Sequence, residues 1–159
     1  MSTPRSGPTQ RSVTSTPVQI ASLVLGVVFL LIGLLGFIPG ITSNIDQLAN
    51  AGHDSDAMLF GLFQVSILHN LVHVVFGVAG LAAARVAAAA GIYLLLGGFI
   101  YLGLWICGLM LTKGEFVDLI PLNTADNWLH FTLGVGMIML GILLARGSRA
   151  CTGNPLSRP

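Results

Sequence analysis

Three histidines stand inside apolar stretches of this chain, where polar residues are rare. His69 and His73 are four positions apart, so on a helix they share one face and could grip a single metal ion together. His130 opens another apolar stretch and could supply a third ligand, or serve with His69 as an axial ligand of haem. Because neutral imidazole is a common metal ligand, His69, His73 and His130 are a candidate metal or haem site.

Polar neighbours allow two other interpretations of the same cluster. The side chains could satisfy one another's hydrogen bonds between helices; the set is His69, Asn70, His73, Asp126, Asn127 and His130. The histidines could also mark a path for protons or a small solute, because polar groups inside a membrane normally face the protein interior or a water-filled cavity. The sequence leaves these three interpretations open.

Asp126 also has a purely local explanation. It lies near the start of an expected helix, which Thr124 or Asn123 could cap. A carboxylate in the first helical turn is favoured by the helix dipole. This explanation covers Asp126 without a functional role, but it covers neither His130 nor the pair of histidines before it.

The composition indicates a protein surrounded by lipid. Hydrophobic residues make up 54% of the 159 residues and charged residues only 8%, whereas soluble domains carry about 25% charged residues. The net charge of +1 provides no basic field to attract nucleic acid. Neither a zinc-type cysteine spacing nor a nucleophile–base pair or paired carboxylates is visible, so an enzyme is the poorest fit.

Four apolar runs are long enough to cross a bilayer, at residues 18–38, 60–84, 88–111 and 126–145. They predict an all-α, four-transmembrane-helix bundle over residues 18–145. The second run is longer than the hydrocarbon thickness of about 30 Å, so it either tilts or begins above the membrane. The polar tails 1–17 and 146–159 are expected to be disordered.

The basic residues predict how this bundle is oriented in the membrane. Four spans place both termini on one side, where six arginines also fall, and only Lys113 falls on the other side. The positive-inside rule then predicts cytoplasmic termini and puts the polar cluster in the outer half of the bundle.

Helical spacing predicts that His69, Asn70 and His73 share one stripe with small residues, opposite a lipid-facing side. Tyr101 and Trp105 of the third span could add an aromatic wall to the cluster. The 20 glycines of the chain indicate close helix packing and would permit a homodimer.

Four segments resemble a known family. They are Gly36–Gly40, Leu62–His73, Phe76–Gly80 and Pro121–His130. Together they resemble the uncharacterised membrane family catalogued as domain of unknown function 4383, which is common in actinobacteria. The resemblance implies four spans in a bacterial plasma membrane, and it implies no activity, cofactor or ligand role.

These observations favour a structural or accessory membrane protein whose polar cluster serves packing or a partner subunit. The alternatives are a metal- or haem-binding protein that uses His69, His73 and His130, and a proton or small-solute transporter. The lipid bilayer is the expected surrounding in each case, with a second copy or another membrane protein as a further partner.

Overall fold

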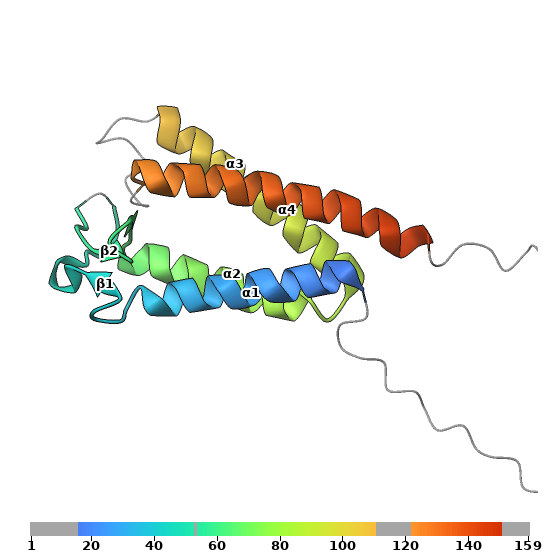
Figure 1. Cartoon of the computed structure of the whole chain (residues 1–159), viewed down its shortest axis with the longest axis horizontal. Coiled ribbons are helices and arrows are strands. Elements are labelled where there is room, and N and C mark those ends of the chain that lie inside the picture. Colours follow the sequence, from blue (N-terminus) through green and yellow to red (C-terminus); the bar gives the residue numbers. More distant parts are fainter. Residues whose placement is uncertain (1–15, 53, 111–121, 151–159) are drawn as a thin grey trace, which may run out of the picture.

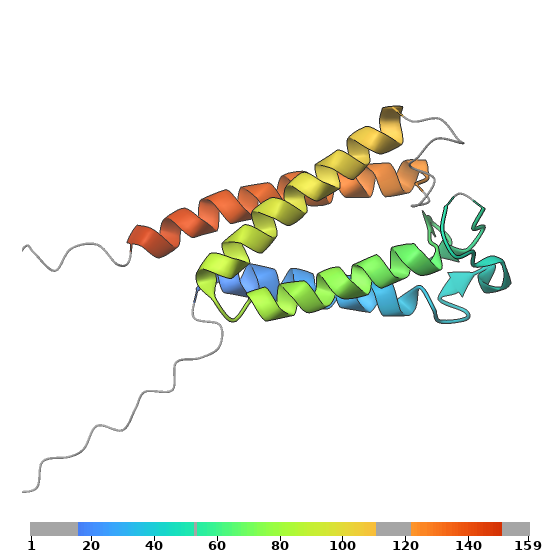
Figure 2. The ribbon, with the colours of Figure 1, turned by 180° about the vertical axis from the view of Figure 1, so that it is seen from behind.

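The computed structural model describes residues 16–52, 54–110 and 122–150, and in this part of the chain four helices account for most residues. They are α1 (Pro17–Leu35), α2 (Ile67–Ala83), α3 (Ala87–Met110) and α4 (Thr124–Ala150). α1 packs antiparallel along α2, and α3 packs antiparallel along α4 (Figures 1 and 2). The start of α1 and the end of α4 lie at the same end of the bundle, which we call the terminal end.

The helices are those of a multi-pass membrane protein. α1, α3 and residues Thr124–Leu144 of α4 are each long and apolar enough to cross a membrane, with mean hydropathies of 2.7, 2.0 and 1.6. α2 is a shorter apolar helix of 17 residues, which corresponds to a length of about 26 Å. Large apolar side chains such as Val24, Leu96 and Phe99 point outward and are more than half exposed, as expected of side chains that contact lipid.

The opposite end of the bundle carries a small antiparallel sheet that the sequence did not predict. Its three short strands, in the order β1-β2-β3, are β1 (Thr42–Ser43), β2 (Met58–Leu59) and β3 (Phe63–Gln64). Thr42 pairs with Leu59, which pairs in turn with Phe63. A 3-10 helix, Ile45–Gln47, lies between β1 and β2. We call this end of the molecule the sheet end (Figure 1).

The predicted start of the second span, at residue 60, is therefore wrong. Phe60 and Gly61 have positive φ angles of 55° and 69°, which turn the chain back on itself between β2 and β3. The helix begins only after Ser66, whose Oγ accepts a hydrogen bond from the backbone N–H of His69 at 3.1 Å. A short apolar run fits a buried strand as well as a helix, so hydrophobicity alone could not separate the two.

The other predicted boundaries differ from the structure by a few residues. α1 ends at Leu35 rather than at residue 38, and α4 continues to Ala150 beyond the predicted limit of 145. Residues 1–15 and 151–159 of the two expected tails lie outside the described residues, as does Lys113.

Glycines allow the helices of each pair to approach closely, as predicted. A Cβ atom added to Gly26 of α1 would lie 2.7 Å from the backbone nitrogen of Leu81 in α2. In the second pair, a Cβ atom added to Gly98 would lie 2.8 Å from the carbonyl oxygen of Gly134. Backbone therefore packs directly on backbone, in the manner typical of membrane helices.

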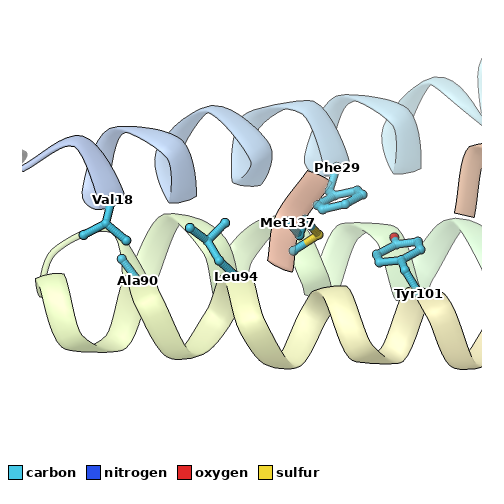
Figure 3. Close-up of a cluster of buried hydrophobic side chains, with 6 residues drawn as sticks. All are labelled: Val18, Phe29, Ala90, Leu94, Tyr101 and Met137. Atoms are coloured by element: carbon cyan, nitrogen blue, oxygen red, sulfur yellow. The ribbon is translucent and has the colours of Figure 1, made fainter. Parts of the chain in front are cut away.

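The main core runs between the two helix pairs (Figure 3). Its fully buried members are Val18, Phe29, Ala90, Leu94, Tyr101 and Met137. Val18 faces Ala90 near the terminal end, whereas Phe29 and Tyr101 lie further along, with ring centroids 5.4 Å apart and ring planes 6° from parallel. A second small core, formed by Ala57, Leu59 and Val65, lies under the sheet. The histidines lie between these two cores.

Candidate functional site

The structure brings the three histidines together between the helix pairs. The imidazole rings of His69 and His73 stack on successive turns of α2, with centroids 4.6 Å apart. The ring of His130 reaches them from α4, with its centroid 6.2 Å from that of His69. All three side chains are buried, at 5%, 8% and 3% exposed, so they look toward neighbouring helices and away from lipid.

Aromatic rings from the other two helices complete the cluster. Phe29 of α1 stacks against His73 at a centroid distance of 5.9 Å, and Tyr101 of α3 lies 5.2 Å from His130. Each of the four helices therefore contributes at least one ring. Trp105, the other residue proposed for an aromatic wall, packs on Phe131 instead.

A cavity of about 50 Å³ lies beside the histidine rings, on the side of the sheet. Its walls come from α1, α2, α4 and the segment 59–65, and the lining residues are Phe29, Ile32, Leu59, Phe60, Phe63, Val65, His69, His73, Asp126, Leu129, His130 and Leu133. A smaller cavity of about 20 Å³ shares the three histidines and is completed by Val72, Tyr101 and Leu104. The rings thus form a wall common to both cavities.

The Nδ1 atoms of His69, His73 and His130 are buried and have no hydrogen-bond partner. The hydrogen-bond network predicted among the polar cluster is therefore not formed by these rings. Asn70 does not join it either, because its side-chain amide packs against Gly36 and both amide atoms lack a partner. Asn127 donates instead to the carbonyl oxygen of Gly108 in α3, at 3.1 Å.

Asp126 is held by the start of its own helix and by the sheet. Asn123 caps α4, as predicted, because its Oδ1 accepts from the backbone N–H of Asp126 at 2.9 Å. In turn, Oδ2 of the Asp126 carboxylate accepts a hydrogen bond from the backbone N–H of Asn123 at 3.1 Å. The same Oδ2 atom also accepts from the backbone N–H of Gln64 in β3, at 3.1 Å.

Asn123 makes a further contact with the turn between β2 and β3. Its side-chain N–H donates to the carbonyl oxygen of Leu62 at 2.8 Å. Together, Asn123 and Asp126 fasten the segment 58–64 to the first turn of α4, over one wall of the larger cavity.

The family model described as "Domain of unknown function (DUF4383)" matches residues 19–143. The chain belongs to this family. No curated protein and no solved structure matches the chain. The matched range contains every residue of the histidine cluster and the sheet that covers it, so the whole site is part of the DUF4383 domain.

In this DUF4383 protein, the arrangement of the histidine rings can be compared with that of metal ligands. Within the described residues, no group of three His, Cys, Asp or Glu side chains is placed to hold a metal ion. The stacked rings of His69 and His73 lie face to face, whereas ligands of one ion need nitrogens that converge on a single point. The metal or haem site therefore stays a prediction.

Several residues that line the larger cavity were not predicted from the sequence. Leu129 and Leu133 lie one turn apart on the face of α4 that carries His130, so helical periodicity could have identified them. Phe60 and Phe63 could not be found in that way, because they belong to a turn and a strand in a range that hydrophobicity predicts to be helical.

Proposed function

We propose that this integral membrane protein binds a small solute in the cavity beside its histidines, as a binding or carrier protein. The observation that supports this most directly is that the imidazole rings of His69, His73 and His130 all line one cavity. Leaving a buried polar group without a partner costs about 1–3 kcal/mol. A solute that hydrogen-bonds to ring nitrogens on the cavity side would offset part of the cost of burying these polar rings.

A purely structural role explains the cluster less well. Histidines kept for packing would be expected to form hydrogen bonds across the helices, and the three Nδ1 atoms form none. Apolar side chains of similar size would fill the same space without an unpaired group. Unfavourable polar groups gathered around a cavity are more typical of a binding site than of a scaffold.

Access to the cavity is proposed from the sheet end. On the other side the cavity is bounded by the main core, where Phe29 is fully buried against Tyr101. At the sheet end, Phe60 lines the cavity and is 59% exposed. Phe60 therefore marks the part of the wall that is nearest to the surface.

The arginine distribution supports an orientation for this access. Arg85 lies in the turn between α2 and α3, opposite the sheet, and the other arginines flank the terminal end in the sequence. The positive-inside rule then places the terminal end in the cytoplasm of a bacterial cell and the sheet on the outer face of the plasma membrane. In this orientation, the cavity receives its solute from outside.

The proposal is tested by nuclear magnetic resonance of the full chain in lipid nanodiscs, with ¹⁵N-labelled histidine. The protein is titrated with four probes of different chemistry: formamide, sodium formate, ammonium chloride and zinc sulfate. We expect at least one probe to shift the imidazole resonances saturably in the wild type and to lose this effect in His130→Leu. Thr132→Val, which alters an exposed hydroxyl on the same helix, is the matched control. If none of the probes shifts the resonances, the proposed function is wrong.

A proton path is a second candidate, favoured by the smaller cavity. The three histidines lie in the walls of both cavities, and each cavity exceeds the roughly 10–15 Å³ that one water molecule needs. Imidazole can pass a proton between waters on its two sides. Proteoliposomes should then show a proton flux that is absent from His73→Ala, and equal fluxes in the two proteins would exclude this candidate.

A further inference from the structure

The larger cavity selects its solute by size and by charge. We propose that it binds an uncharged molecule of about three or four non-hydrogen atoms that both donates and accepts hydrogen bonds. This inference rests on the proposed function, and it specifies the chemical class of the solute.

The volume sets the size limit. The cavity measures about 50 Å³, and a cavity needs roughly 10–15 Å³ to hold one water molecule. The space therefore holds about four water-sized groups. Phe29, Leu59 and Val65, at most 2% exposed, form closely packed parts of the wall, so the cavity cannot widen there without disturbing a core. A six-atom molecule such as glycerol is too large.

The charges in the wall argue against an ion. Among the described residues that line the cavity, Asp126 is the one Asp, Glu, Lys or Arg. Its Oδ2 atom already accepts hydrogen bonds from the backbone N–H groups of Asn123 and Gln64. Most of the remaining wall is aliphatic or aromatic, and such surroundings do not replace the hydration shell of an ion.

The imidazoles provide the recognition. A neutral imidazole offers one N–H donor and one nitrogen acceptor, and the rings of His69, His73 and His130 all line this cavity. A solute with both a donor and an acceptor, such as a small amide, can bind two rings at once. A molecule that only accepts or only donates leaves one of them unpaired.

Such a small solute binds weakly. The affinity that each non-hydrogen atom can contribute has an upper limit, and for three atoms it corresponds to a Kd of about 0.5 mM or weaker. The experiment therefore needs millimolar titrations and a method that reports on the site itself, which the histidine resonances provide.

The test uses pairs of probes that match in size and differ in charge. Formamide is compared with formate, and acetamide with acetate, on the full ¹⁵N-histidine-labelled chain in lipid nanodiscs. Methylammonium represents a cation and glycerol a larger neutral molecule. We expect saturable shifts with formamide and acetamide only.

A cavity-filling variant links the shifts to this cavity. Leu133→Phe adds volume at the wall, and we expect it to weaken amide binding at least 10-fold. Leu143→Phe adds the same volume at a position that is 57% exposed on the same helix, and it should leave the affinity unchanged. If Leu133→Phe does not fold, judged by gel filtration, Leu129→Phe takes its place.

The outcomes separate the two proposals. Saturable binding of formate, acetate or methylammonium without binding of the amides would overturn the neutral-solute inference and leave the proposed function standing. Binding of glycerol with equal affinity, or amide binding that survives the cavity-filling variant, would also overturn the inference. If no probe in either panel binds, the proposed function itself is wrong.

Discussion

At the scale of single residues, an unpaired polar group gains meaning from its position. Asn70 is fully buried, and both of its amide atoms lack partners. It packs against Gly36 and lines neither of the two cavities. The Nδ1 atoms of His69, His73 and His130 are equally unpaired, but their rings form the wall shared by both cavities. Unlike Asn70, the histidines therefore combine an unpaired nitrogen with a ring that borders open space.

Replacing His69 by leucine should not destabilise the protein. The substitution removes a buried nitrogen that has no partner and keeps a similar side-chain volume, so we expect the free energy of unfolding to rise by about 1 kcal/mol. Thermal unfolding in detergent, followed by circular dichroism, measures the change. Ser66→Ala is the contrasting variant, because it removes the cap of α2 and should lower the free energy by about 1 kcal/mol. A large loss of stability in His69→Leu would show that the ring holds the fold together.

At the scale of elements, the sheet is fastened to both ends of the site. The backbone N–H groups of Ile67 and Leu68, in the first turn of α2, donate to the carbonyl oxygens of Ala49 and Asn50 at 3.0 Å. On the other side, Asp126 of α4 accepts from Gln64. The segments 42–52 and 54–65 therefore connect the starts of α2 and α4 and lie over the histidines at the sheet end.

Removing the Asp126 carboxylate should make the segment 58–65 open more often. In Asp126→Ala, the backbone N–H groups of Gln64 and Asn123 lose an acceptor, and hydrogen bonds to charged groups contribute about 1.5–3 kcal/mol each. We expect amide hydrogen exchange in residues 58–65 to become about 10-fold faster or more, measured by mass spectrometry in nanodiscs. Asp56→Ala, at an exposed carboxylate of the same loop, should leave exchange unchanged. Unaltered exchange in Asp126→Ala would mean that other contacts hold the sheet.

The helices were easier to predict than the sheet that lies over the histidines, for a physical reason. Runs such as 88–111 satisfy their backbone within one helix, so length and hydrophobicity predicted α3 to within one residue at each end. The Asn123 cap was also predictable, because it is a contact across three residues. The bond from Asp126 to Gln64 joins residues 62 positions apart, and no local pattern encodes such a partner. The cavity depends on the same long-range contacts, so the sequence could predict the histidine cluster but not the space beside it.

At the scale of the whole molecule, the bundle has two unlike ends. Towards the terminal end, the interior is filled by side chains such as Val18, Ala90 and Leu94 (Figure 3), and Ser22 of α1 donates to the carbonyl oxygen of Gly80 at 2.9 Å. Towards the sheet end, the helix pairs enclose the histidines and the larger cavity. The described interior is thus filled by side chains towards one end and holds a cavity towards the other, which suits the one-sided binding proposed above.

This asymmetry makes the orientation of the bundle testable. In a background with Cys107→Ala and Cys151→Ala, Asp54→Cys places a single thiol at the sheet end, and Val86→Cys places one in the turn between α2 and α3. Both native side chains are exposed. The positive-inside rule predicts that a membrane-impermeant maleimide labels Asp54→Cys in intact cells and Val86→Cys only after the membrane is permeabilised. Labelling of both thiols in intact cells would contradict the arrangement of spans, and the reverse pattern would turn the cavity toward the cytoplasm.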